Sequence, residues 1–127
     1  MCLQELGTIA RHNLPIEVFV FNNLGHGIQK QTINTWLNGN QLGVDYESGL
    51  YFPQFDLIAK SFNLRYKKIE SINQAEALLA SKRESPIIYD VMISPTQTIH
   101  PMLRYGGDLT NLDSSVIKPD FKLFKIS

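Results

Sequence analysis

Hydrophobic residues recur at helical spacing in several segments of the chain. In the first, Leu3, Leu6 and Ile9 share one face, and Pro15 limits its extension because the residue before a proline avoids the helical region. In another, Ser71 or Asn73 is suited to cap a helix at its start. The pattern predicts helices over residues 3–11, 28–37, 53–63 and 71–83.

Strand-forming runs lie between these helices. Residues 16–21 (IEVFVF) and 86–93 (PIIYDVMI) are almost uninterrupted in apolar character, which favours strands covered on both faces, and residues 65–70 predict a shorter strand. Strands that alternate with helices are joined by right-handed crossovers into a parallel sheet. We therefore predict the α/β class, with a three-layer arrangement of a parallel sheet and helices on both of its faces.

The rest of the chain shows little periodicity. Residues 40–53 mix Gly, Asp, Ser and Tyr, and we expect an irregular segment there. We expect four aromatic residues to anchor this segment or an interface: Trp36, Tyr46, Tyr51 and Phe52. Prolines and glycines interrupt the sequence beyond Ser94. We predict one domain over residues 1–127, with residues 95–127 as an extended tail.

The amino-acid composition argues against several classes of function. The chain has 127 residues, 43% of them hydrophobic and 19% charged, as in an ordinary globular domain. Its 12 basic and 12 acidic side chains cancel, which argues against nucleic acid or an anionic membrane as a partner. Cys2 stands alone, and no apolar run approaches the roughly 20 residues that span a bilayer. A reduced, cytoplasmic location is the expectation.

The clearest candidate for chemistry is the loop Asn22–Gly27 (NNLGHG), which follows the first predicted strand. Ligands of open parallel sheets bind outside the carboxyl ends of the strands. Amide and carbonyl oxygens suit magnesium, and the start of the next helix offers N–H groups to phosphate. The competing interpretation is an Asx turn with two glycines for flexibility. For Asp90, late in a buried strand, we expect a structural hydrogen bond.

Two runs resemble a known family. LQELGTIARHNLPIEVFVFNNLGHGIQKQ and the later SPIIYDVMISPTQTIHPM are similar to the carboxyl-terminal diphosphate-binding domain of thiamine diphosphate-dependent enzymes, among them acetolactate synthase large subunits. The resemblance implies that Asn23 and Gly25 bind Mg²⁺ through the Asn23 side chain and the Gly25 carbonyl. It implies the following cofactor-binding residues: Asn23, Leu24, Gly25, His26, Gly27 and Ile28. We also expect that the His26 imidazole reaches the diphosphate or substrate, or else faces solvent.

The sequence departs from the family in several ways. The family's Gly-Asp-Gly triplet, whose aspartate binds magnesium, is absent from the 21 residues before Asn22, and the glutamate of the pyrimidine-binding domain is absent as well. We therefore expect a truncated form of the domain that is inactive in isolation. Ile28 and Thr32 stand where many acetolactate synthases carry methionine and tryptophan. The donor and acceptor substrates stay open.

Two classes of function follow. In the first, the chain is the carboxyl-terminal part of a thiamine diphosphate- and magnesium-dependent lyase or transferase that acts on a 2-oxo acid. The resemblance then implies partners: a pyrimidine-binding domain of the same or another subunit, in a homo-oligomer. In the second, the chain is a non-catalytic α/β interaction module or a gene remnant. Because an unpaired sheet edge is expected, self-association is predicted in either case.

Overall fold

The computed structural model describes residues 3–82, 85–103, 107 and 112–113. Helices and strands alternate largely as predicted, and their bounds differ from the predicted ones by no more than a few residues. The elements are α1 (Glu5–Arg11), β1 (Glu17–Asn22), α2 (Gly27–Trp36), α3 (Phe55–Ser61), β2 (Arg65–Ile69), α4 (Ile72–Ala80), β3 (Ile87–Met92), β4 (Met102–Leu103) and β5 (Leu112–Asp113).

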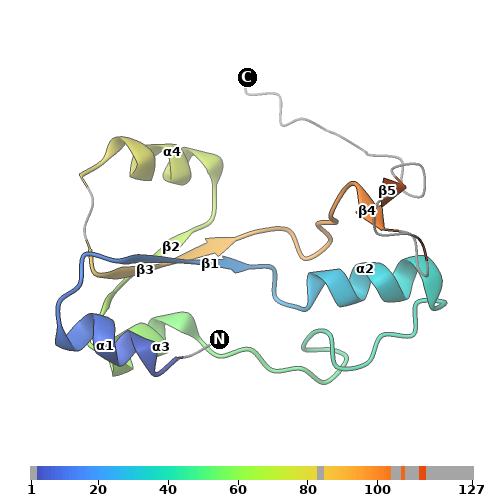
Figure 1. Ribbon diagram of the computed structural model, residues 1–127, viewed down its shortest axis with the longest axis horizontal. Helices are drawn as coiled ribbons and strands as arrows, with labels where there is room; N and C mark the ends of the chain where they lie inside the picture. Colours follow the sequence, from blue (N-terminus) through green and yellow to red (C-terminus); the bar gives the residue numbers. More distant parts are fainter. Residues whose placement is uncertain (1–2, 83–84, 104–106, 108–111, 114–127) are drawn as a thin grey trace.

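The first three strands form a parallel sheet in the order β1-β3-β2. Helices α1 and α3 lie on one face of this sheet and α4 lies on the other (Figure 1). Of the two predicted caps of α4, the structure has Ser71, whose hydroxyl accepts a hydrogen bond from the backbone N–H of Gln74, while Asn73 lies within the helix. The predicted three-layer α/β arrangement is confirmed.

The central strand β3 contributes to two hydrophobic clusters, because successive side chains of a strand point to opposite faces. Ile88 packs with Leu6 and Ala59 on the side of α1 and α3. Ile87 and Tyr89 pack with residues of β2 and α4 on the other side. This double burial explains why residues 86–93 read as a nearly continuous apolar run.

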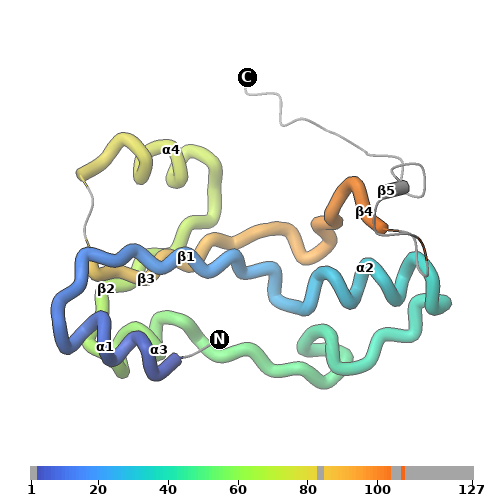
Figure 2. The backbone as a smooth tube through the Cα atoms, viewed as in Figure 1, coloured from blue at the N-terminus to red at the C-terminus, as the bar shows by residue number. Residues whose placement is uncertain are grey.

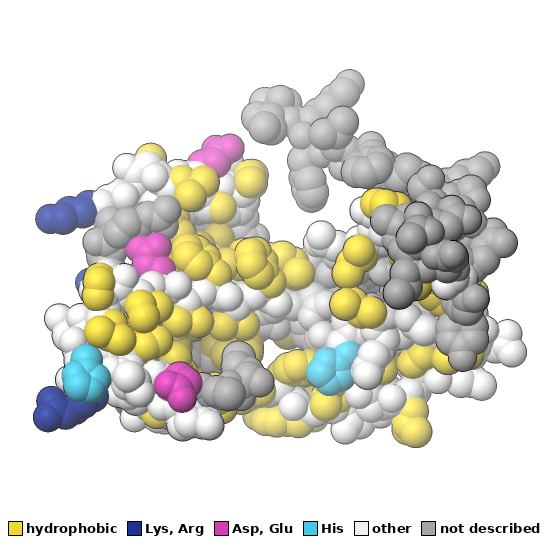
Figure 3. All heavy atoms as spheres, viewed as in Figure 1, with side chains coloured by type: hydrophobic (Ala, Val, Ile, Leu, Met, Phe, Trp, Pro, Cys, Tyr) yellow, Lys and Arg dark blue, Asp and Glu magenta, His cyan; other side chains and the backbone are white. Residues whose placement is uncertain are grey.

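The prediction that residues 16–21 are covered on both faces is wrong. Strand β1 lies at the edge of the sheet, where the side chains of Phe19 and Phe21 are 42% and 69% exposed. Helix α4 packs on residues of β2 and β3, and the ring of Phe19 on β1 stacks on the ring of Tyr89 with 4.9 Å between the centroids. Figure 3 shows hydrophobic side chains gathered along this part of the molecule.

Residues 40–53 form no helix or strand, as predicted, and run back past α2 toward α3 (Figure 2). The short antiparallel pair β4–β5 lies within the segment predicted as a tail. The other residues beyond 103, except 107, lie outside the described part of the chain. Within the described residues, no helix has the length and apolar character that a membrane crossing requires.

Candidate functional site

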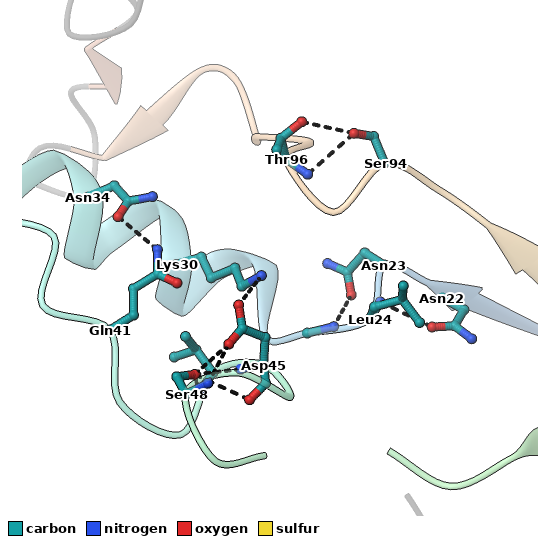
Figure 4. Close-up of polar contacts among 12 residues, drawn as sticks. Asn22, Asn23, Leu24, Lys30, Asn34, Gln41, Asp45, Ser48, Ser94 and Thr96 are labelled. Carbon is teal, nitrogen blue, oxygen red and sulfur yellow. Dashed lines mark hydrogen bonds and ion pairs between the residues drawn. The ribbon is translucent and has the colours of Figure 1, made fainter. Parts of the chain in front are cut away.

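The loop Asn22–Gly27 leaves β1 at the carboxyl edge of the sheet and turns through two Asx motifs. The Asn22 Oδ1 atom accepts a hydrogen bond from the N–H of Leu24 at 3.1 Å, and Asn23 Oδ1 accepts one from the N–H of Gly25 at 3.3 Å (Figure 4). Leu24 takes a φ of 57°. The Asx-turn geometry is therefore present, and it leaves each amide oxygen a second lone pair for a ligand.

A partly buried hydrogen-bond network holds the loop from the side of the sheet. The Asp90 carboxylate on β3 is only 5% exposed and accepts hydrogen bonds from Asn22 Nδ2 at 3.0 Å and from the Tyr66 hydroxyl at 2.9 Å. Burial and the adjacent Asp90 raise the pKa of Tyr66 to about 12. The structural role predicted for Asp90 is confirmed, and Tyr66 is a partner that the sequence did not reveal.

A cavity of about 490 Å³ opens at this edge of the sheet. Its wall includes Tyr66 and Asp90 from the network, together with Leu24 of the loop and Phe52 of the irregular segment. The carboxyl ends of the strands are thus hollowed, as expected for an open parallel sheet.

The irregular segment packs against the other side of the loop. The backbone N–H of His26 donates to the Val44 carbonyl at 2.8 Å, and Gly25 forms an isolated antiparallel bridge with Asp45. The Lys30 ammonium on α2 lies 2.7 Å from the Asp45 carboxylate. We did not predict Lys30 or Asp45 as part of the site, because the segment 40–53 has no periodicity that would show where it docks.

A Cβ atom at either glycine of the loop would force a neighbouring group to move. A Cβ atom at Gly25 would lie 2.8 Å from the Val44 carbonyl oxygen, and one at Gly27 would lie 2.5 Å from Asn23 Nδ2. The Asn23 amide therefore lies directly over the first residue of α2. This packing brings a side-chain amide, a loop carbonyl and a helix N-terminus into one small region.

The remaining predicted site residues lie around this region. The imidazole of His26 is exposed and makes an edge contact with the ring of Phe52, at 5.7 Å between centroids. Ile28 is 65% exposed on the first turn of α2, while Tyr46 and Tyr51 of the irregular segment are also largely exposed. Phe52 thus anchors the irregular segment to the loop, and the two tyrosines contribute little to that anchoring.

The groups present fit an anion better than they complete a metal site. The first N–H groups of α2 have no carbonyl partner within the helix and can donate to a diphosphate. Magnesium would gain the Asn23 amide oxygen and the Gly25 carbonyl, both neutral. No group of three or more His, Cys, Asp or Glu side chains suited to a metal occurs among the described residues. The diphosphate itself would have to supply part of the coordination shell.

The sequence matches a known protein family and several known proteins. Residues 1–91 match the family described as "Thiamine pyrophosphate enzyme, C-terminal TPP binding domain". A probable acetolactate synthase large subunit of Methanococcus aeolicus is 31% identical over 118 residues, which cover 91% of this chain and 19% of that protein. Acetolactate synthase 1 (chloroplastic) of Zea mays is 31% identical over 113 residues, which cover 84% of this chain and 18% of that protein. The chain thus spans about a fifth of the length of these curated relatives.

Proposed function

The chain belongs to the thiamine pyrophosphate enzyme family through its C-terminal TPP-binding domain, and on this premise we propose that the loop between β1 and α2 binds the diphosphate of thiamine diphosphate. The observation that carries the proposal is the packing of the Asn23 amide over Gly27. This contact puts the side-chain amide of Asn23, with its Nδ2 atom nearest to Gly27, beside the N-terminus of a ten-residue helix, where a phosphate group is favoured.

The residues of the loop take separate roles in this proposal. Asn23 and Gly25 bind Mg²⁺ through the amide and carbonyl oxygens. Backbone N–H groups at the start of α2 donate to the diphosphate, and Leu24, His26 and Ile28 line the cofactor. Thiamine diphosphate, when bound, supplies the carbanion stabilisation needed to cleave or form a bond beside the carbonyl of a 2-oxo acid. The chain itself orients the cofactor by holding its charged end.

We extend the proposal to the enzyme in which such a domain acts. The relatives named above are acetolactate synthases, and we infer a lyase or transferase of that kind, completed by a pyrimidine-binding domain of the same or a partner subunit in a homo-oligomer. The described metal donors are neutral, so the chain alone is expected to hold magnesium weakly and to lack activity. A cytoplasmic location remains part of the prediction.

Isothermal titration of the purified chain with thiamine diphosphate, with and without magnesium, tests the proposal. We expect magnesium-dependent binding that weakens in Asn23→Ala. The matched control is Asn73→Ala, since Asn73 is an exposed asparagine on α4. Equal affinities in the presence and absence of magnesium, or an Asn23→Ala variant that binds as well as Asn73→Ala, would refute the assignment of these ligands.

A second function is favoured by the exposed aromatic side chains on β1. Phe19 and Phe21 project from an edge strand whose only pairing within the described residues is with β3. Such an edge can accept another strand, from a second copy or from another protein. Static light scattering that shows a concentration-dependent increase in mass, lost in Phe21→Lys, together with no cofactor binding, would favour a non-catalytic interaction module.

A further inference from the structure

An ion pair joins α2 to the irregular segment beside the proposed cofactor loop. The Lys30 Nζ and Asp45 Oδ2 atoms are 2.7 Å apart, and the two side chains are only 17% and 20% exposed. Figure 4 shows the Lys30 side chain reaching from α2 to Asp45 on the irregular segment, beside the loop that carries Asn22 and Asn23. It is better shielded than the Lys68–Glu70 ion pair, whose side chains are 45% and 58% exposed.

Ser48 fixes the orientation of the Asp45 carboxylate. Its backbone N–H and hydroxyl both donate to Asp45 Oδ1, at 2.9 and 2.6 Å. The same hydroxyl oxygen accepts hydrogen bonds from the N–H groups of Val44 and Asp45. Hydrogen bonds from Lys30 and Ser48 lower the pKa of Asp45 to about 2, so the carboxylate is charged at neutral pH. We call Lys30, Asp45 and Ser48 the clasp.

The clasp acts on the backbone of the loop itself. Val44, next to Asp45, is 2% exposed, and its carbonyl accepts the N–H of His26 at 2.8 Å. The Lys30 ammonium would lie 3.3 Å from a Cβ atom at Gly25, so it packs over the residue whose carbonyl we assign to magnesium. A change in the clasp therefore reaches Gly25 and His26 through direct contacts.

We propose that Asp45 and Lys30 are positioning residues that hold the Gly25–Gly27 backbone in its binding conformation. The backbone part of this inference stands on the geometry alone, and its consequence for affinity rests on the proposed function. Ser48 contributes by holding the carboxylate toward Lys30. The pair also cancels a positive charge beside a loop that is proposed to receive an anion.

Because Asp45 cancels the charge of Lys30, substitutions in the pair distinguish two roles for Lys30. If the clasp positions the loop, Asp45→Asn and Lys30→Met both weaken cofactor binding, since each breaks the pair. If Lys30 instead serves as a direct ligand of the diphosphate, Asp45→Asn releases a cation toward the anion and tightens binding, while Lys30→Met weakens it. Ser48→Ala leaves the charges unchanged and is expected to weaken binding only if positioning matters.

The first experiment is amide hydrogen exchange followed by mass spectrometry on the ligand-free chain. We expect exchange in peptides covering residues 22–30 and 43–52 to accelerate by about two- to tenfold in Asp45→Asn and Ser48→Ala, as expected from losing one partly shielded ion pair or its hydrogen bonds. The control, Glu70→Gln, makes the same carboxylate-to-amide change in the exposed pair with Lys68. Unchanged exchange in both clasp variants would overturn the inference.

The second experiment is titration of the same variants with thiamine diphosphate and magnesium. Weaker binding in Asp45→Asn, Lys30→Met and Ser48→Ala supports positioning, and tighter binding in Asp45→Asn overturns it. If the wild-type chain does not bind the cofactor, the proposed function fails for the isolated chain, whereas the exchange measurement still decides whether the clasp orders the loop.

Discussion

Tyr66→Phe offers a sharp test of the partly buried network beneath the loop, because it removes one oxygen atom and keeps the ring. The Tyr66 hydroxyl donates to Asp90 Oδ2 at 2.9 Å, and Asp90 is 5% exposed. A hydrogen bond to a charged group contributes about 1.5–3 kcal/mol. Both residues line the cavity at the carboxyl edge of the sheet, through which water can reach the carboxylate. We therefore expect Tyr66→Phe to lower the free energy of unfolding by about 1.5 kcal/mol, the lower end of that range.

Urea unfolding followed by circular dichroism measures this loss directly. Thermal unfolding gives a second measure. The melting temperature of a domain of this size changes by roughly 4 °C per kcal/mol of unfolding free energy, so it should fall by about 6 °C in Tyr66→Phe. Tyr46→Phe is the matched control, since Tyr46 is 77% exposed. A loss in Tyr66→Phe no greater than in Tyr46→Phe would refute the claim that Asp90 depends on this donor.

The pH dependence of the same pair gives a second check. The pKa of Tyr66 is raised from 10.0 to about 12, so folding favours the protonated hydroxyl. Its contribution to stability is complete below pH 10 and is lost as the pH rises through 12. The difference in unfolding free energy between wild type and Tyr66→Phe should therefore shrink over that range. A difference that stays constant up to pH 12 would contradict the assigned donor.

Three further outcomes are expected. Gly27→Ala should displace the Asn23 side chain, because the added Cβ atom would lie 2.5 Å from Asn23 Nδ2, and magnesium-dependent cofactor binding measured by titration should weaken. The control is Gly7→Ala, whose Cβ atom would make contacts of ordinary length and should leave binding unchanged. The pKa of Asp45 is lowered from 3.8 to about 2, so the contribution of the charged carboxylate to the free energy of unfolding is complete above pH 3.8 and disappears as the pH falls through 2. The difference in unfolding free energy between wild type and Asp45→Asn should shrink over the same range. Gln31→Leu removes the two hydrogen bonds by which Gln31 holds the backbone after β3, and should accelerate amide exchange in that segment but not in β1.

The local elements could be predicted from the sequence because their causes lie within a few residues of each element. The spacing of Leu6 and Ile9 marked α1, and the turn-forming NNLGHG loop marked the end of β1. The order of helices and strands then indicated a parallel sheet, since crossover connections allow few other arrangements. Family resemblance located Asn23 and Gly25 as proposed ligands.

The edge position of β1 was decided by the tertiary structure. Residues 16–21 and 86–93 read alike as apolar runs, but only β3 is covered by helices on both faces. Hydrophobic pattern records which side chains tend to be buried, and it does not say which strand lies between the other two. The exposure of Phe21 follows from strand order and from where α4 packs.

The support of the candidate site also depends on contacts between distant segments. Tyr66 meets Asp90 across 24 positions, and the Lys30–Asp45 pair joins a helix to a segment without periodicity. Such pairs leave no local signal, because a polar residue can equally face solvent. By itself, the sequence determined the α/β class, the elements and the loop that resembles a cofactor site. Only the packing of the chain decided which side chains hold that loop, since long-range hydrogen bonds and ion pairs depend on distances in space.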